Sequence, residues 1–491
     1  MRLEKKSILQ YILFGLLYTL GVAIFTVCAW YALTFDLEFK ELLYTLASPL
    51  KGTGQSTVAE ILSACLPVML IFVVLYAVAI CLLEKKITWR YAKRVGACFC
   101  AALLVCSLVF SVFALRIPGY VKALTEKTSI YEDYYIDPDT VAITAEGTPK
   151  NLIYIYLESM ETTYASTLQG GAQGVNYMPN LTALAQENLS FSDKASGLLG
   201  GFHTPLGTGW TMSALLATTS GIPFSFPLGE NGHNDMVYRE TFASGLTTLG
   251  DVLAKQGYRQ KFLCGSDSAF GGRKTYFEQH GNYEIFDLYT AREENYIPDD
   301  YYVWWGFEDK ILYEIAKDEL TDLASSGEPF NFTMLTVDTH HVNGFTCSLC
   351  EYEYVTKLSN VVSCADRQLA DFLDWCREQD FYEDTVIVVT GDHPRMDTTL
   401  VGETDYYNRT IYNCFINAAT QPVGATAERV MTSFDIFPTT LAAMGFSIEG
   451  DRLGLGVNLF STLPTLAEQL GYEYLETEIN KFSDYYIREF S

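Results

Sequence analysis

Basic residues are scarce in this 491-residue chain, which has 33 Lys and Arg against 59 Asp and Glu and a formal net charge of -26. This excess of negative charge repels phosphate backbones, so nucleic acid is excluded as a partner. Internal repeats and low-complexity blocks are also lacking, while 49% of the residues are hydrophobic and 14% are aromatic. That composition supplies a large core and excludes intrinsic disorder as the main character of the chain.

Charge is absent from three long apolar runs near the N terminus. They cover residues 9–31, 62–83 and 95–115, and each has the roughly 20 residues that a helix needs to cross hydrocarbon. The first run is longer than the apolar core of a signal peptide, and no small-residue cleavage site follows it. We therefore predict a transmembrane domain, residues 1–116, with three membrane-spanning helices.

Basic residues flank these runs unevenly. Three precede the first run, and the loop at 32–61 has only Lys40 and Lys51. The loop between the second and third runs has five: Lys85, Lys86, Arg90, Lys93 and Arg94. Because cytoplasmic loops are enriched in Lys and Arg, we expect the N terminus and loop 84–94 to be cytoplasmic. The sequence thus predicts a multi-pass protein of the cytoplasmic membrane whose remaining residues are extracytoplasmic.

The exported part begins with a Tyr-rich, acidic segment at 117–150, which we expect to be a linker near the lipid headgroups. In residues 151–491, short apolar runs alternate with helix-like segments such as 179–189, 246–257 and 364–379. This alternation is typical of an α/β domain with a mostly parallel sheet.

Polar side chains follow four of the predicted strands. Residues 152–157 run into Glu158, 260–264 into residues 265–267, 332–337 into residues 338–341, and 385–390 into residues 391–393. The carboxyl ends of parallel strands meet at one edge of a sheet, where ligands bind. A mixed set of carboxylates and imidazoles there suits a divalent zinc or manganese ion.

A Gly-rich turn at 207–210 precedes a helix-forming stretch that starts near Thr211. A hydroxyl at a helix N terminus lies beside free backbone N–H groups, which favour both an alkoxide and a bound phosphate. On the residues alone, an N-cap is the simpler interpretation of the same hydroxyl. The residues alone leave both interpretations of Thr211 open.

Six of the twelve cysteines lie outside the apolar runs. The spacing of Cys347 and Cys350 suggests either a zinc site or a redox pair. No second CxxC pair or paired-histidine motif follows, which argues against zinc. We instead predict a structural disulfide from Cys347 or Cys350 to Cys364.

Several motifs together carry a family resemblance: residues 156–159 (YLES), 178–181 (MPNL), 207–211 (GTGWT) with 220–223 (SGIP), 338–341 (DTHH), 391–393 (GDH) and 452–459 (RLGLGVNL). Over roughly residues 145–460 the chain resembles the membrane-anchored, extracytoplasmic branch of the alkaline phosphatase and sulfatase superfamily. That branch includes phosphoglycerol transferases and lipoteichoic acid synthases. The resemblance implies an alkaline phosphatase/sulfatase-like fold, with a mostly parallel central sheet and flanking helices.

The resemblance also implies a set of metal ligands. Thr211 would be both nucleophile and ligand, joined around one divalent ion by Glu158, Asp392 and His393. Manganese is the first expectation for this ion, with zinc or magnesium as alternatives. Sulfatases need a Cys or Ser in a Cys/Ser-x-Pro-x-Arg setting, and Thr211 followed by Met-Ser-Ala-Leu departs from it. Hydrolysis of sulfate esters is therefore not expected.

Two further residues are implied to bind the substrate. His340 matches the histidine that contacts the substrate phosphate, and His341 is the alternative for this role. Arg273 matches an arginine that lipoteichoic acid synthases use on the glycerol-phosphate headgroup. Gly271 stands where those synthases have a Trp, so one wall of the pocket differs.

The implied function is transfer of glycerol phosphate from phosphatidylglycerol, a lipid of the bilayer, to an extracytoplasmic glycan, with release of diacylglycerol. A phosphothreonine-type intermediate would carry the group. Transfer of phosphoethanolamine and polymerisation of glycerol phosphate are alternatives within the class. A catalytically inactive, glycan-binding ectodomain is an alternative from another class, against which the intact set of Glu158, Thr211, Asp392 and His393 argues.

Overall fold

The computed structural model describes residues 5–35, 37–47, 55–86, 89–145, 147–228, 236, 239–401 and 404–491. Arg2 and Lys51, which enter the orientation argument, lie outside the described residues. The chain forms two compact units, one of residues 1–42 and 54–122 and one of residues 43–53 and 123–491.

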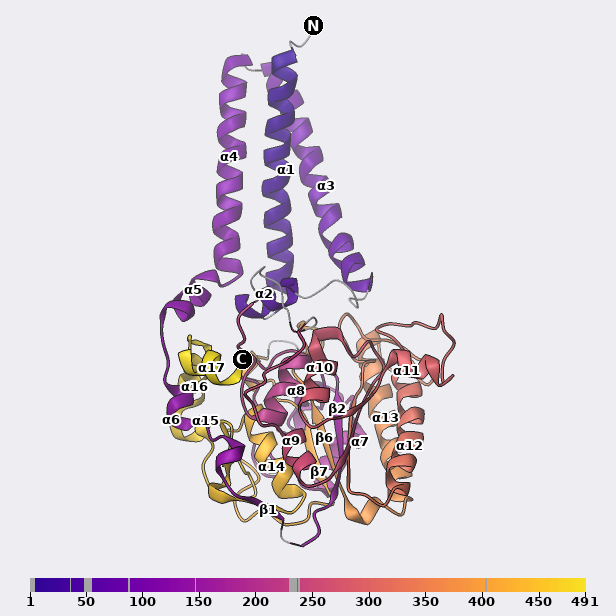
Figure 1. The fold of residues 1–491 in the computed structure, drawn as a ribbon. Coiled ribbons are helices and arrows are strands. Elements are labelled where there is room, and N and C mark those ends of the chain that lie inside the picture. Colours follow the sequence, from indigo (N-terminus) through magenta and orange to yellow (C-terminus); the bar gives the residue numbers. More distant parts are fainter. Residues whose placement is uncertain are drawn as a thin grey trace. The chain divides into compact units, whose positions relative to one another are not determined.

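The first unit consists mainly of three long helices, α1 (Lys5–Thr34), α3 (Gln55–Lys86) and α4 (Trp89–Ala114) (Figure 1). Each contains an apolar stretch long enough to cross a membrane, at Ile12–Thr34, Ala59–Ala79 and Arg94–Ala114. The three predicted apolar helices are thus confirmed, and they suggest a membrane anchor. Two shorter helices, α2 (Phe39–Ala47) and α5 (Ile117–Thr125), follow α1 and α4 in the chain.

A six-stranded sheet is the centre of the second unit, with the strand order β4-β3-β5-β2-β6-β7. The strands are β2 (Asn151–Leu157), β3 (Arg259–Cys264), β4 (Glu284–Phe286), β5 (Phe330–Leu335), β6 (Thr385–Gly391) and β7 (Asn413–Ile416). Only β7 is antiparallel to its neighbour. This arrangement confirms the predicted mostly parallel sheet.

Strand β2 lies between β5 and β6 and is buried on both faces. Leu152, Tyr154 and Tyr156 belong to one hydrophobic cluster, which includes side chains of α8 (Thr211–Ser220), α9 (Leu249–Lys255), α10 (Arg273–Gln279) and α14 (Ile436–Ala443). Ile153 and Ile155 belong to the other, with side chains of α7 (Pro179–Glu187), α12 (Asp309–Ser325) and α13 (Lys357–Arg377). Helices therefore cover both faces of the sheet (Figure 1), which is why this strand is a continuous apolar run.

The helices of the second unit are α6 (Ile130–Tyr134), α7 (Pro179–Glu187), α8 (Thr211–Ser220), α9 (Leu249–Lys255), α10 (Arg273–Gln279), α11 (Leu288–Glu293), α12 (Asp309–Ser325), α13 (Lys357–Arg377), α14 (Ile436–Ala443), α15 (Leu466–Leu470), α16 (Tyr472–Asn480) and α17 (Asp484–Phe490). The helical segments expected at 179–189, 246–257 and 364–379 correspond to α7, α9 and α13. Helix α13 begins earlier than expected because the Thr356 hydroxyl accepts a hydrogen bond from the Ser359 backbone N–H and caps the helix.

The segment at 117–150 differs from the expected linker. Strand β1 (Ile143–Ala145) pairs antiparallel with β8 (Phe446–Ile448), so its residues are part of the second unit. Tyr131 of α6 is fully buried and packs edge-on against Tyr486 and Phe490 of α17. The boundary between the units therefore lies at Ala123 in the structure. The Tyr-rich composition that suggested a linker instead supplies aromatic packing.

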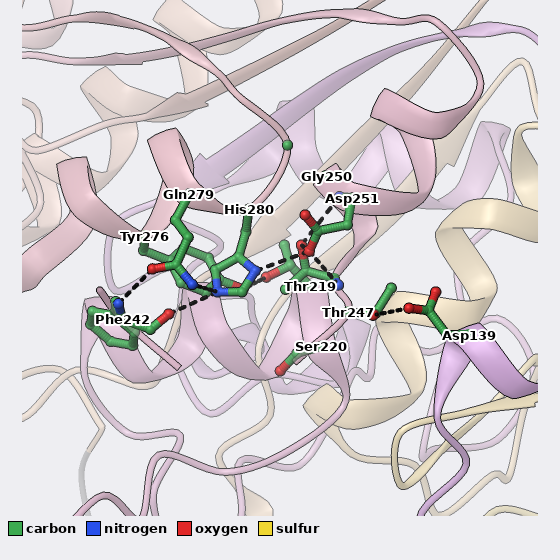
Figure 2. A network of polar contacts seen from close by, with 12 residues as sticks. Asp139, Thr219, Ser220, Phe242, Thr247, Gly250, Asp251, Tyr276, Gln279 and His280 are labelled. Atoms are coloured by element: carbon green, nitrogen blue, oxygen red, sulfur yellow. Dashed lines mark hydrogen bonds and ion pairs between the residues drawn. The ribbon is translucent and has the colours of Figure 1, made fainter. Parts of the chain in front are cut away.

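Figure 2 shows a buried polar network that joins three helices of the second unit. The Tyr276 hydroxyl of α10 lies 2.6 Å from the Thr219 hydroxyl near the end of α8. The His280 imidazole follows α10 and bridges the Asp251 carboxylate of α9, at 2.9 Å, and the Phe242 carbonyl, at 2.8 Å. The network thereby fixes the C-terminal ends of α8 and α10, two helices that begin at predicted site residues.

His280→Phe should destabilise the chain, because it keeps a ring but removes both nitrogens that bridge Asp251 and Phe242. Leaving buried polar groups without a partner costs about 2 kcal/mol of unfolding free energy. The matched control is Thr247→Val, which removes a hydrogen bond to Asp139 at the exposed edge of the same network. We expect this control to change stability by less than about 0.5 kcal/mol. Thermal unfolding of the full chain in detergent measures both, and equal shifts would contradict the role given to His280.

Candidate active site

The register between β2 and β6 brings two carboxylates to the same level of the sheet. Leu157 pairs with Gly391, so Glu158 and Asp392 follow at adjacent strand ends. One oxygen of Asp392 accepts hydrogen bonds from the backbone N–H groups of Ser159, at 2.8 Å, and His393, at 2.7 Å. This carboxylate therefore ties together the two loops that leave the strands.

Four predicted site residues lie close together at this edge. Glu158, Asp392 and His393 each place one donor atom within 4.8 Å of the other two. All three side chains are buried, with exposed fractions of 2%, 0% and 1%. The Thr211 hydroxyl lies 3.3 Å from Oε2 of Glu158 and 3.5 Å from Nε2 of His393.

The hydrogen bond of His393 directs its Nε2 toward this cluster. Its Nδ1 lies 2.8 Å from the Pro394 carbonyl oxygen, which can only accept, so Nδ1 carries a proton. Nε2 lies 3.3 Å from Oδ2 of Asp392 and 3.7 Å from Oε1 of Glu158. Burial opposes protonation of Nε2, but these two carboxylates outweigh it and raise the pKa of His393, and a bound cation would take the place of the Nε2 proton. Oδ2 of Asp392 is buried and accepts no hydrogen bond from the described residues.

The electrostatics of the cluster favour a cation. Burial and the nearby charge of Glu158 raise the pKa of Asp392 to about 7. Burial also opposes ionisation of Glu158, but His340 and His393 outweigh it and lower the pKa of that carboxyl. Two carboxylates and an imidazole lone pair converge in a site screened from water, and they fit a divalent ion with mixed oxygen and nitrogen ligands.

Thr211 is the first residue of α8, and its hydroxyl does not cap the helix. Trp210 has the extended backbone of the N-cap position, and its N–H donates to the Ser213 hydroxyl at 3.1 Å. The Thr211 side chain is instead directed toward Glu158 and His393. Of the two interpretations that the sequence left open, this geometry agrees with a role in the site.

A buried ionic network supports the loops around the cluster. Glu161 accepts hydrogen bonds from the Arg409 guanidinium, at 2.7 and 3.0 Å, and from the Arg395 backbone N–H, at 3.0 Å. The Arg395 guanidinium pairs with Asp397 at 2.7 Å and donates to the Thr339 carbonyl at 3.0 Å. The network therefore joins the segments that follow β2, β5 and β6. Sequence reasoning missed it, because Glu161 and Arg409 are 248 residues apart.

His340 lies close enough to the cluster to interact electrostatically with Glu158 and His393 when its ring is protonated. Burial lowers the pKa of His340, so its imidazole is neutral near pH 7. Its Nδ1 lies 2.6 Å from the His341 carbonyl oxygen, which leaves Nε2 as the free nitrogen. Burial lowers the pKa of His341 further still, and the two rings stack with centroids 4.6 Å apart.

Arg273 lies near the start of α8, but its guanidinium is bound to its own turn. It donates to the carbonyls of Phe270, at 3.0 Å, and Asp267, at 2.7 Å, and to the Ser266 hydroxyl at 3.1 Å. Gly271 has a φ of 68°, and a Cβ atom there would lie 3.4 Å from Met212, the residue after Thr211. The turn is therefore adjacent to the first turn of α8.

Trp305 is a neighbour of the site that the sequence analysis did not identify. Its ring centroid lies 4.5 Å from that of His340 and 5.8 Å from that of Phe270, so it connects the His340 segment with the Arg273 turn. Four of the five residues at 301–305 are aromatic, which was a signal in the sequence. Because this loop is distant from every motif in the chain, only the fold reveals where it lies.

A mostly parallel sheet with a threonine, two carboxylates and a histidine at its carboxyl edge defines an alkaline phosphatase- or sulfatase-type protein. Comparison with known families agrees. The family model described as Sulfatase matches residues 150–446, and the chain belongs to this family.

Curated relatives include phosphoglycerol transferase I of Salmonella choleraesuis, which is 31% identical over 435 residues, covering 85% of this chain and 52% of the relative. The Salmonella typhimurium protein of the same name is 31% identical over 430 residues, covering 84% and 52%. This chain thus spans about half the length of these relatives. Among solved structures, the lipoteichoic acid synthase LtaP of Listeria monocytogenes aligns with a TM-score of 0.50 and 18% identity, covering 65% of this chain and 79% of that chain. This likeness confirms the predicted fold.

Removal of one ligand should weaken metal binding. We expect the full chain, stripped with a chelator, to bind manganese, and Asp392→Asn to weaken this binding at least tenfold, because the amide lacks the negative charge. Asp384→Asn, an exposed position at the opposite end of β6, is the matched control and should bind manganese like the unchanged chain. Calorimetric titration in detergent measures the affinities. Equal affinity in Asp392→Asn and the unchanged chain would exclude Asp392 as a ligand.

Proposed function

We propose that this protein is a membrane-anchored phosphotransferase that moves glycerol phosphate from phosphatidylglycerol to a hydroxyl of an extracytoplasmic glycan. The observation that carries the proposal is the Thr211 hydroxyl, held 3.3 Å from Glu158 and 3.5 Å from His393 at the start of a helix. Membership of the sulfatase family and the relatives named phosphoglycerol transferase I support the transferred group.

Thr211 would act as the nucleophile. Its oxygen forms a bond to the phosphorus of the donor, the bond from phosphorus to the diacylglycerol oxygen breaks, and the proton from Thr211 ends on that oxygen. A glycan hydroxyl then attacks the same phosphorus, the bond from phosphorus to the Thr211 oxygen breaks, and the hydroxyl proton returns to Thr211, so the two displacements together retain configuration. The free N–H groups at the start of α8 would bind phosphoryl oxygens. A divalent ion held by Glu158, Asp392 and His393 would lower the pKa of the Thr211 hydroxyl and stabilise negative charge on those oxygens.

The anchor would keep the enzyme close to its donor. A lipid donor stays in the membrane, and the apolar helices α1, α3 and α4 would hold the catalytic unit at the same surface. The distribution of basic residues supports an extracytoplasmic catalytic unit on the cytoplasmic membrane.

Replacing Thr211 separates a nucleophile from a structural hydroxyl. Thr211→Ala should abolish release of diacylglycerol, because the covalent route is lost, while manganese binding through the remaining three ligands is weakened but measurable. Thr211→Ser retains a hydroxyl and should retain part of the activity. The assay uses purified full chain with radiolabelled phosphatidylglycerol in detergent. Activity of Thr211→Ala equal to that of the unchanged chain would disprove the mechanism.

The donor can be identified by its headgroup. Glycerol ends in a neutral diol, whereas ethanolamine ends in an ammonium, which the buried positive charge of Arg273 would repel. We therefore expect diacylglycerol release from phosphatidylglycerol and little from phosphatidylethanolamine under the same conditions. Release from phosphatidylethanolamine alone would overturn the donor but leave the role of Thr211 intact. Release from neither lipid, with manganese supplied, would support another donor or the inactive ectodomain.

A further inference from the structure

Three cysteine sulfurs lie together on the segment that connects β5 to α13 and on α13 itself. Sγ of Cys347 lies 3.8 Å from Sγ of Cys350 and 3.9 Å from Sγ of Cys364, and all three sulfurs lie within 4.8 Å of one another. Cys347 and Cys364 are buried, while Cys350 is half-buried. This cluster shares no residue with the candidate active site.

The distances between the sulfurs match those between thiolates that share one metal ion. Zinc binds thiolates at about 2.3 Å with tetrahedral geometry, which places neighbouring sulfurs about 3.8 Å apart. A disulfide would instead join two sulfurs at about 2.05 Å and leave the third cysteine unused. Cys347 is nearly equidistant from the other two sulfurs, so the structure favours neither possible disulfide partner.

The polar groups around the cluster donate to sulfur. The Leu349 backbone N–H points at Sγ of Cys347, with a distance of 3.4 Å. The Gln368 side-chain amide lies one helical turn after Cys364 and donates to it at 3.5 Å, and to Cys347 at 3.9 Å. N–H donors stabilise a negatively charged sulfur.

We propose that Cys347, Cys350 and Cys364 form a second metal site, which binds one thiolate-preferring divalent ion of the zinc type. The ion displaces the thiol protons and is coordinated by three thiolates, with a water in the fourth position. The half-buried Cys350 side provides the entry. This site selects a softer metal than the oxygen and nitrogen ligands of the active site.

The ion would cross-link a segment that begins at the active site. Gly344 donates its N–H to the His340 carbonyl at 3.1 Å, and Phe345 donates to the Asp338 carbonyl at 2.7 Å. Cys347 follows directly, and Cys364 lies on the buried face of α13. Metal binding would therefore fasten the residues after His340 to a core helix.

The disulfide expected from the sequence involved the same three cysteines. No second CxxC pair follows Cys350, but a three-thiolate site needs only one further cysteine. The segment that connects β5 to α13 folds back against this helix, and Cys364 of α13 is the third cysteine. The structure thus brings the three cysteines together, but no disulfide joins them.

The test uses full chain purified in detergent without reductant or chelator, and measures bound zinc and the near-ultraviolet absorption after cobalt substitution. Cobalt bound to thiolates gives an intense charge-transfer band, which oxygen and nitrogen ligands do not give. We expect one zinc per chain that remains in Asp392→Asn, and a cobalt–thiolate band that is lost in both Cys364→Ser and Cys350→Ser. Cys376→Ser, a buried position on the same helix, is the matched control and should keep the band.

Cys350→Ser guards against a folding defect, because Cys350 lies on a half-buried loop and not in the core. A mass lower by two hydrogens in the unreduced chain, with a peptide linking two of the three cysteines, would overturn the proposal. Three free thiols without a cobalt–thiolate band, or a band unchanged in both cysteine variants, would overturn it as well.

Discussion

The parallel pairing of β2 with β6 is the constraint on which the rest of the site depends. It brings Glu158 and Asp392, which are distant in sequence, to the same edge and the same level. Both strands are buried on both faces, so a slip of one residue would move every apolar side chain to the opposite layer. The free energy of the core therefore fixes the spacing of the two carboxylates. Their mutual repulsion is a local cost that the core outweighs and that a bound cation would relieve.

The charged side chains around the site are buried, and ion pairs stabilise them in place of water. Glu161, Arg395, Asp397 and Arg409 are almost completely buried, and each has an oppositely charged partner. Removal of one member would leave an uncompensated charge, which is far more destabilising than the loss of an exposed pair. These residues bind backbone groups of the loops that present Glu158, Asp392 and His393. The same interactions that stabilise the unit thus orient its chemistry.

Much of this arrangement follows from the sequence, since strand ends and motifs are local. The four strands that present polar groups, the parallel sheet and the close approach of Glu158, Thr211, Asp392 and His393 were all predictable from runs of residues and their family resemblance. The orientation of Arg273 could not be predicted from the sequence, because its guanidinium binds carbonyls of a turn whose shape depends on Gly271. The position of Trp305 and the ionic network around Glu161 could not be predicted either, because their partners come from loops far apart in the chain. The segment at 117–150 shows that composition alone does not distinguish a linker from a segment that packs by its aromatic rings.

The two clusters of metal-type ligands differ in chemistry, and this difference would let each cluster bind a different metal. Carboxylates and an imidazole at the sheet edge accept manganese or zinc, whereas three thiolates exclude manganese by their softness. The segment at 338–347 runs from one cluster to the other, with His340 near its start and Cys347 at its end. An ion on the thiolates would restrict this segment and so limit the positions open to His340. Because the thiolates would bind zinc while the sheet-edge ligands also suit manganese, the two sites need not compete for the same metal.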